Sequence, residues 1–266
     1  MSDSTPSAAL IDRLRRVAAG SAVPQAAPAA AAADAWLRHG LARGQLHEIY
    51  AGDADDGPAA IGFAVALALA AGALPALWVR LEQDEALTGR LHATGLVQLG
   101  LPPDALILVV VADAAARLRV AADAARCAGL GSVVIESRGR APEHDLTATR
   151  RLQLAAEASG VTILGVRIGA QVVPSAAATR WGVAATPSAL LEADAPGLPA
   201  FDVECLRRRG GPAGARCRVE WNRDQRCFDP SFGSSFGQAP LAGAGIPLAV
   251  GGAVAIDPAA SVRARG

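Results

Sequence analysis

The chain of 266 residues contains no lysine, because all 25 of its basic residues are arginine. A phosphate-binding loop built around a lysine side chain is therefore excluded within this chain. The 25 acidic residues bring the formal net charge to zero. A protein without excess positive charge does not coat nucleic acid through its overall charge, so any DNA contact must be local or made through a partner.

Cysteine and long apolar runs are also scarce. The four cysteines form no C-x-x-C pair and have no histidines at zinc-finger spacing, so neither a metal site nor a disulfide framework is expected. The N-terminus lacks an apolar core of signal-peptide length, and the alanine-rich run at residues 59–71 is too short to span a bilayer. We therefore expect a cytoplasmic protein with reduced thiols, without a metal, a cofactor or a membrane anchor.

Length and composition predict one large domain with tails, because 52% of the residues are apolar and 19% are charged. Residues 1–35 are expected to hold a short helix, at 8–19, and a linker of alanine and proline. Residues 36–228 are expected to form the folded domain. Residues 229–266 are rich in Gly, Ala and Pro without periodicity, which predicts a disordered tail.

Within the folded domain, short apolar runs alternate with helical patterns, which is typical of parallel strands joined by crossover helices. The expected strands are Leu46–Tyr50, Ala76–Arg80, Leu106–Val111, Ser132–Glu136 and Val161–Val166. The expected helices are Ala59–Ala71, Leu87–Leu99, Ala114–Ala128 and Asp145–Ser159. Asp145 is a natural N-cap and Gly160 a natural stop for the last helix. Three shorter strands, at Arg180–Ala185, Phe201–Arg207 and Arg216–Trp221, predict antiparallel additions at one edge of the sheet.

The segment after the first strand has the frame of a phosphate-binding loop without its reactive side chains. Gly52 and Gly57 stand in the relation of the two glycines of G-x-x-x-x-G-K-[ST]. Pro58 occupies the lysine position and has no N–H, and Ala59 occupies the hydroxyl position and has no oxygen. Three aspartates within the loop would also repel a triphosphate. Because proline is well accepted in the first turn of a helix, we expect the strand, turn and helix to persist without nucleotide.

Eight segments follow one another in a recognisable order. They are HEIYAG (47–52), LWVR (77–80), LGLPPDALILV (99–109), VVIES (133–137), DLTATRRLQLAAEASGVT (145–162), PSAAATRWGV (174–183), LRRRGG (206–211) and VEW (219–221). In this order they resemble RecA-like recombinases, and more closely the ImuA family of bacterial SOS mutagenesis proteins. The resemblance implies an α/β, RecA-like core of the phosphate-loop NTPase type, with a mainly parallel central sheet, helices on both faces and antiparallel edge strands toward the C-terminus.

The resemblance also implies former roles for two carboxylates. Glu82 falls where a recombinase keeps the glutamate that activates the attacking water, and Glu136 falls where the Walker B aspartate supports Mg²⁺. Without a lysine and a hydroxyl ligand these groups cannot organise phosphoryl transfer, so we predict that the protein is not an enzyme. Arg80 and Arg167, at strand ends, are available to pair with them internally. A residual nucleotide site and a site for some other small ligand are the alternatives.

Without catalysis, function is expected to lie in surfaces. Basic residues gather in the second half of the domain, and a tryptophan beside arginine is a common interface anchor. The candidate partner or DNA contacts are Arg150, Arg151, Arg180, Trp181, Arg207, Arg208, Arg209, Arg216 and Arg218. Salt-dependent contact with phosphates along a cationic sheet edge is one interpretation. A solvated strand face that prevents edge pairing, and a tryptophan buried in the core, are the alternatives.

Two of these arginines belong to the helix that begins at Asp145. We expect Arg150 and Arg151 on its outer face, since Leu146, Leu154 and Ala158 mark the inner one.

The ImuA resemblance implies a non-catalytic adaptor in SOS-induced error-prone translesion DNA synthesis. One implied partner is ImuB, which is an inactive relative of the Y-family polymerases. The others are a C-family error-prone DNA polymerase and RecA itself. DNA contact is expected to be indirect or weak, and the protein is expected at the nucleoid when DNA is damaged. Two other functions stay open: a SulA-like cell-division inhibitor that binds FtsZ, and a divergent ATPase completed by a partner. The segment at 145–162 favours the ImuA family over SulA.

Overall fold

The structure is a computed structural model, and it describes residues 41–230 except 189–191, 193–194, 196, 211–212 and 215. The expected N-terminal helix and linker, and the expected tail beyond residue 230, lie outside the described residues.

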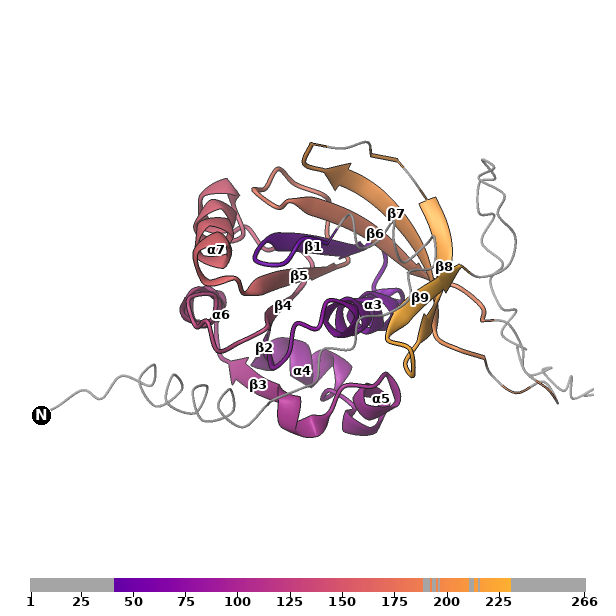
Figure 1. Ribbon diagram of the computed structural model, residues 1–266. Coiled ribbons are helices and arrows are strands. Elements are labelled where there is room, and N and C mark those ends of the chain that lie inside the picture. The colour runs from indigo at the N-terminus through magenta and orange to yellow at the C-terminus, as the bar shows by residue number, and fades with distance from the viewer. Residues whose placement is uncertain are drawn as a thin grey trace, which may run out of the picture. The chain divides into compact units, whose positions relative to one another are not determined.

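Over these residues the strands form one nine-stranded sheet in the order β3-β2-β4-β5-β1-β6-β7-β8-β9 (Figure 1). The strands are β1 Leu46–Ala51, β2 Ala76–Leu81, β3 Leu106–Val111, β4 Ser132–Arg138, β5 Thr162–Ile168, β6 Thr179–Ala185, β7 Ala200–Arg208, β8 Arg216–Asn222 and β9 Cys227–Pro230. Neighbours from β3 to β6 pair in parallel, and β7, β8 and β9 add in antiparallel fashion. The expected RecA-like arrangement of a mainly parallel sheet with antiparallel edge strands is confirmed.

Two details of the sheet differ from expectation. The strand expected at Arg180–Ala185, now β6, pairs in parallel with β1, so the antiparallel part begins only at β7. A further strand, β9, pairs with β8 and runs past residue 228, where the sequence predicted the end of the folded domain. Because β9 has only four residues, it carries too short a pattern for the period of a strand to be read from sequence.

Helices cover both faces of the sheet. They are α3 Gly57–Ala70, α4 Glu82–Thr88, α5 Ala93–Gln98, α6 Ala114–Ala124 and α7 Leu146–Ser159, with a 3₁₀ turn at Pro103–Ala105. Figure 1 shows α6 and α7 on one face and α3 on the other, with α4 and α5 near α3. The single helix expected at Leu87–Leu99 is wrong: Gly89, at φ +80°, ends α4, and the His92 side chain accepts a hydrogen bond from the Gly95 N–H to begin α5.

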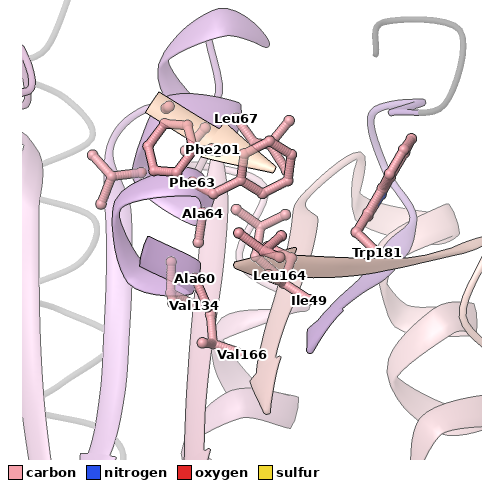
Figure 2. Packing of buried hydrophobic residues seen from close by; sticks show 14 of the residues in the cluster. Ile49, Ala60, Phe63, Ala64, Leu67, Val134, Leu164, Val166, Trp181 and Phe201 are labelled. Carbon is pink, nitrogen blue, oxygen red and sulfur yellow. The ribbon is translucent and has the colours of Figure 1, made fainter. Parts of the chain in front are cut away.

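The central helix α3 is apolar on all sides because protein covers it on all sides. Ala60, Ala64 and Leu67 are buried in the same cluster as the sheet residues Ile49, Leu164 and Val166 (Figure 2). Toward the antiparallel strands, the ring of Phe63 lies 5.7 Å from that of Phe201 and 5.4 Å from that of Phe228, between centroids. Burial of one such ring contributes about 2 kcal/mol. Packing therefore fixes α3, and with it the loop that precedes it.

The ends of α7 follow the sequence prediction, but its inner face does not. Asp145 accepts a hydrogen bond from the Ala148 N–H at 2.7 Å, and Gly160 ends the helix in the left-handed conformation. Leu146 is 57% exposed and Leu154 49% exposed, and Ala158 is also exposed. The inner face is made instead by Thr149, Leu152, Gln153, Ala155 and Ala156.

A buried polar residue explains why the inner face of α7 was misassigned. Gln153 is fully buried, because its side-chain oxygen accepts a hydrogen bond from the Leu46 N–H at 2.8 Å. Its amide nitrogen donates to Glu157, also at 2.8 Å. A glutamine at an inner position interrupts the apolar stripe by which the inner face of a helix is recognised. The leucines on the outer side form a second apolar stripe, which was taken for the inner face.

Removal of the N-cap of α7 is expected to lower the free energy of unfolding by the amount that is usual for loss of an N-cap side chain. Asp145→Ala removes the oxygen that satisfies the Ala148 N–H, and the free energy of unfolding should fall by about 1 kcal/mol. Asp145→Asn keeps an acceptor at the same place and should lie close to the parent chain. Chemical denaturation measures both, and equal losses in the two variants would contradict this account of the cap.

Candidate functional site

The loop between β1 and α3 is held near the start of the helix by two hydrogen bonds. The Gly57 N–H donates to the Ala54 carbonyl at 3.0 Å, and Pro58, in the first turn of α3, has no N–H to offer. The Asp56 carboxylate accepts a hydrogen bond from the Ala185 N–H at 2.8 Å and so ties the loop to the end of β6. Donors that would hold an anion at the start of this helix are therefore absent or already engaged at Gly57 and Pro58.

The two glycines of the loop have different surroundings. A Cβ added at Gly57 would lie 3.1 Å from Cγ2 of Ile168 and 3.6 Å from a terminal guanidinium nitrogen of Arg138. A Cβ added at Gly52 would meet nothing within 4 Å. A side chain at Gly57 would therefore press on Ile168 at the end of β5 and touch Arg138 at the end of β4. Those side chains occupy space on the inner side of the loop.

Beside the loop, Glu136 is held by three side chains at the end of β4. Its carboxylate is fully buried and accepts a hydrogen bond from the Trp78 indole N–H at 3.1 Å. Guanidinium groups of Arg80 and Arg138 each approach Oε1 at 3.4 Å. The predicted internal pairing of Arg80 with Glu136 is present, whereas Arg138 was not predicted. Two built-in cations stand beside the carboxylate that the resemblance assigned to Mg²⁺.

Arg117 extends this cluster from the other face of the sheet. Its guanidinium is buried, donates to the Glu136 carbonyl oxygen at 2.8 Å and contacts the carboxylate of Glu143. The Asp84 carboxylate lies 3.8 Å from it. Burial raises the pKa of Asp84, against the opposing effect of Arg117, Arg138 and Arg80. We call the side chains of Arg80, Asp84, Arg117, Glu136, Arg138 and Glu143 the arginine–carboxylate cluster.

Two of the predicted members stand apart from this cluster. Glu82 is exposed in the first turn of α4 and makes no hydrogen bond or ion pair within the described part of the chain. Arg167 is 3% exposed at the end of β5 and likewise forms no ion pair there. The structure therefore pairs only one of the two expected carboxylates with only one of the two expected arginines. Burial separates them, because Glu136 is inside the protein and Glu82 faces solvent.

Sequence reasoning missed a second buried network, around Glu48 of β1. The Glu48 carboxylate accepts hydrogen bonds from the Ser175 hydroxyl at 2.6 Å, from Nε of Arg180 at 3.1 Å and from the Tyr50 hydroxyl at 3.3 Å. Burial first, and then the charge of Glu48, raises the pKa of Tyr50 to about 12. The available signal was a glutamate within a strand that is otherwise apolar apart from His47.

This network changes the assignment of two candidate contact residues. Arg180 is only 8% exposed and is engaged by Glu48 and Ser175, and Trp181 is 1% exposed in the α3 core. Neither side chain is available to a partner in this conformation. Of the two interpretations of Trp181, a tryptophan buried in the core is therefore the one that the structure supports.

The basic residues of β7 and β8 are largely engaged within the protein. Arg207 and Arg209 donate to carbonyl oxygens in the segment Ser175–Ala177. Arg216 pairs with Asp202 at 3.1 Å and lies opposite Glu204 in the register, and Arg218 lies opposite Asp202. Arg208 is half-buried. Acidic and basic residues thus alternate across these strands, and β9 rather than β8 forms the edge of the sheet. Arg207, Arg209, Arg216 and Arg218 are nonetheless exposed, so their contact with a partner or with DNA stays a prediction.

The described residues also bear on thiols, metals and membranes. None of the four cysteines forms a disulfide in the described part of the chain. Among the described residues, no group of three His, Cys, Asp or Glu side chains is placed to hold a metal ion. None of the helices in this part of the chain is long and apolar enough to cross a membrane.

The chain is 38% identical over 149 residues to Protein ImuA from two strains of Caulobacter vibrioides. The similarity supports membership of the ImuA family. The alignment covers 52% of this chain and 57% of the ImuA relatives, so the chain matches little more than half the length of those proteins.

No family model matches the chain. The structure is similar to that of the RadB recombinase, with a TM-score of 0.48 and 14% identity, over 74% of this chain and 94% of the recombinase chain.

Loss of the Glu136 charge is expected to destabilise the fold far more than loss of the Glu82 charge. Glu136→Gln leaves Arg80 and Arg138 facing a neutral group, and breaking a buried ion pair in this way costs about 3 to 5 kcal/mol. Glu82→Gln, on the exposed first turn of α4, should change the free energy of unfolding by less than about 0.5 kcal/mol. Urea denaturation of both variants provides the measurement, and equal small effects would contradict a structural role for Glu136.

Two buried histidines predict a loss of stability in mild acid. The ring of His47 is hydrogen-bonded to Thr179 and to the Ala42 carbonyl, and burial lowers its pKa to about 4. Burial and the nearby arginines lower the pKa of His144 to about 3. The unfolded chain therefore binds more protons than the folded one below pH 6.5, so stability falls as the pH falls.

Each histidine should contribute about 2 kcal/mol to the loss between pH 7 and pH 5. His47→Asn removes one titrating group, so the slope of stability against pH should become shallower even if the variant is less stable at pH 7. Unfolding curves recorded across this range provide the test, and an unchanged slope would contradict the assignment.

Proposed function

We propose that this protein is a non-catalytic, RecA-like adaptor in SOS-induced error-prone translesion DNA synthesis. The observation that carries the proposal is the state of Glu136, whose carboxylate is occupied by Arg80, Arg138 and Trp78. In a phosphate-loop NTPase, metal ions and cationic side chains at this place neutralise developing negative charge on the phosphates. Here the protein's own guanidinium groups pair instead with the Glu136 carboxylate, the group that the resemblance assigned to support of Mg²⁺.

The loop supports the same interpretation. Pro58 has no N–H and the Gly57 N–H is engaged by Ala54, so neither donates to a phosphate, and Asp56 is committed to β6. The helix that follows is held by its aromatic and aliphatic neighbours, without a need for ligand. A core that folds without nucleotide can present its outer surfaces to other proteins.

Similarity to ImuA supports the pathway and the partners. We propose ImuB and a C-family error-prone DNA polymerase as the proteins that the adaptor joins, with RecA as a further partner and cytoplasmic, nucleoid-associated action after DNA damage. DNA contact is proposed to be indirect or weak, since Arg180 is buried and Arg207, Arg209 and Arg216 are engaged within the protein.

Co-elution tests this proposal. The purified chain, mixed separately with ImuB, RecA and FtsZ, is expected to form a complex with ImuB that survives size-exclusion chromatography. If the chain elutes separately from ImuB in one mixture and separately from RecA in the other, the proposal is contradicted. Complex formation with FtsZ, together with filamentous growth on overexpression, would replace it by a division-inhibitor function.

A further inference from the structure

The outward side of α7 carries an apolar stripe bordered by arginine. Leu146, Arg150, Leu154 and Ala158 follow one another at intervals of four residues, and all four are exposed. Residues at this spacing lie one above the other on a helix surface. Single exposed leucines are ordinary, but this pair lies on one ridge with Ala158.

The ridge borders a groove between the end of α6 and the last turns of α7. Leu154, Ala155 and Ala158 form its apolar part, and Arg126 and Arg151 flank it. Its volume is about 530 Å³. Within the described part of the chain, no carboxylate lines it. The groove therefore combines an apolar surface with positive charge.

The nearest acidic residue of α7 is turned to other partners. Glu157 accepts a hydrogen bond from Gln153 at 2.8 Å and lies 3.8 Å from Arg209. Arg126 lies 3.8 Å from Asp123, but both side chains are largely exposed, and a surface pair of this kind contributes about 0 to 1 kcal/mol. Arg151 has no ion pair among the residues that the structure describes. Its charge is thus available to an incoming group.

We infer that this groove is a docking site for an acidic, leucine-bearing segment of a partner protein. An aliphatic side chain of the segment lies on Leu154 and Ala158, and its carboxylates pair with Arg151 and Arg126. Charge complementarity selects this occupant over a basic or purely apolar one. The inference rests on the proposed adaptor function, because it names one surface through which an adaptor holds a partner.

A peptide titration tests the groove directly. The probe is a short amphipathic helical peptide with leucines at i and i+4 and glutamates beside them, and the control peptide has arginines in place of the glutamates. Titrated into the full chain, the acidic peptide should shift the amide resonances of Arg126, Arg151, Leu154 and Ala158, and binding should weaken at high salt. No shift at these residues, or equal binding of the basic peptide, would overturn the inference.

Matched variants exclude a general surface effect. Leu154→Glu and Arg151→Glu should each weaken peptide binding about tenfold or more. Leu87→Glu and Arg90→Glu, which change an exposed leucine and an exposed arginine on and just after α4, should leave it unchanged. Because all four positions are exposed, the variants are expected to fold, and circular dichroism checks this. If the two groove variants and the two control variants weaken peptide binding equally, the inference is overturned.

The same variants separate this inference from the proposed function. If the parent chain co-elutes with ImuB and the groove variants co-elute equally well, the groove inference fails and the function stands. If the parent chain elutes alone while the acidic peptide still binds the groove, the function fails and the groove stands.

Discussion

The rest of the site depends on one buried carboxylate and the cations around it. Glu136 receives two guanidinium groups and an indole N–H beneath the loop that precedes α3. Burying a charge is costly unless it is paired and hydrogen-bonded, so each member of the arginine–carboxylate cluster requires the others. The same arrangement places two guanidinium groups beside the carboxylate to which the resemblance assigned a metal ion. Arg138 reaches both Glu136 and the neighbourhood of Gly57, and therefore joins the end of β4 to the loop.

Much of this fold follows from local sequence pattern. Strands β1, β2, β4 and β5 are short, mainly apolar and buried on both faces, which gives each of them a clear signal. Asp145 and Gly160 mark the ends of α7 by chemistry that acts within a few residues. The helix expected across Gly89 failed because a glycine and a histidine cap act locally against the longer pattern. The inner face of α7 failed for a different reason, since Gln153 is buried by a partner on β1, 107 positions earlier in the chain.

The site was less predictable, because charges find partners that are distant in sequence. The loss of the lysine and the hydroxyl at Pro58 and Ala59 is visible in the sequence alone. The pairing of Arg180 with Glu48 joins residues 132 positions apart, and no spacing rule connects them. Arginines after Phe201 therefore read as a cationic surface, whereas cross-strand carboxylates and backbone carbonyls engage several of them in the fold. Arg150 and Arg151 of α7 are exposed as predicted, although Leu146 and Leu154, which were expected on the inner face, are exposed as well.

The central claim is that internal guanidinium groups have replaced nucleotide and metal at the end of β4. Isothermal titration calorimetry of the purified chain with ATP and Mg²⁺ tests it most directly. The account predicts no binding heat from the parent chain, and the same result when the proposed partner ImuB is present. Tight binding of ATP by the isolated chain would contradict it, because the loop and Glu136 would then have to exchange their internal partners for a ligand.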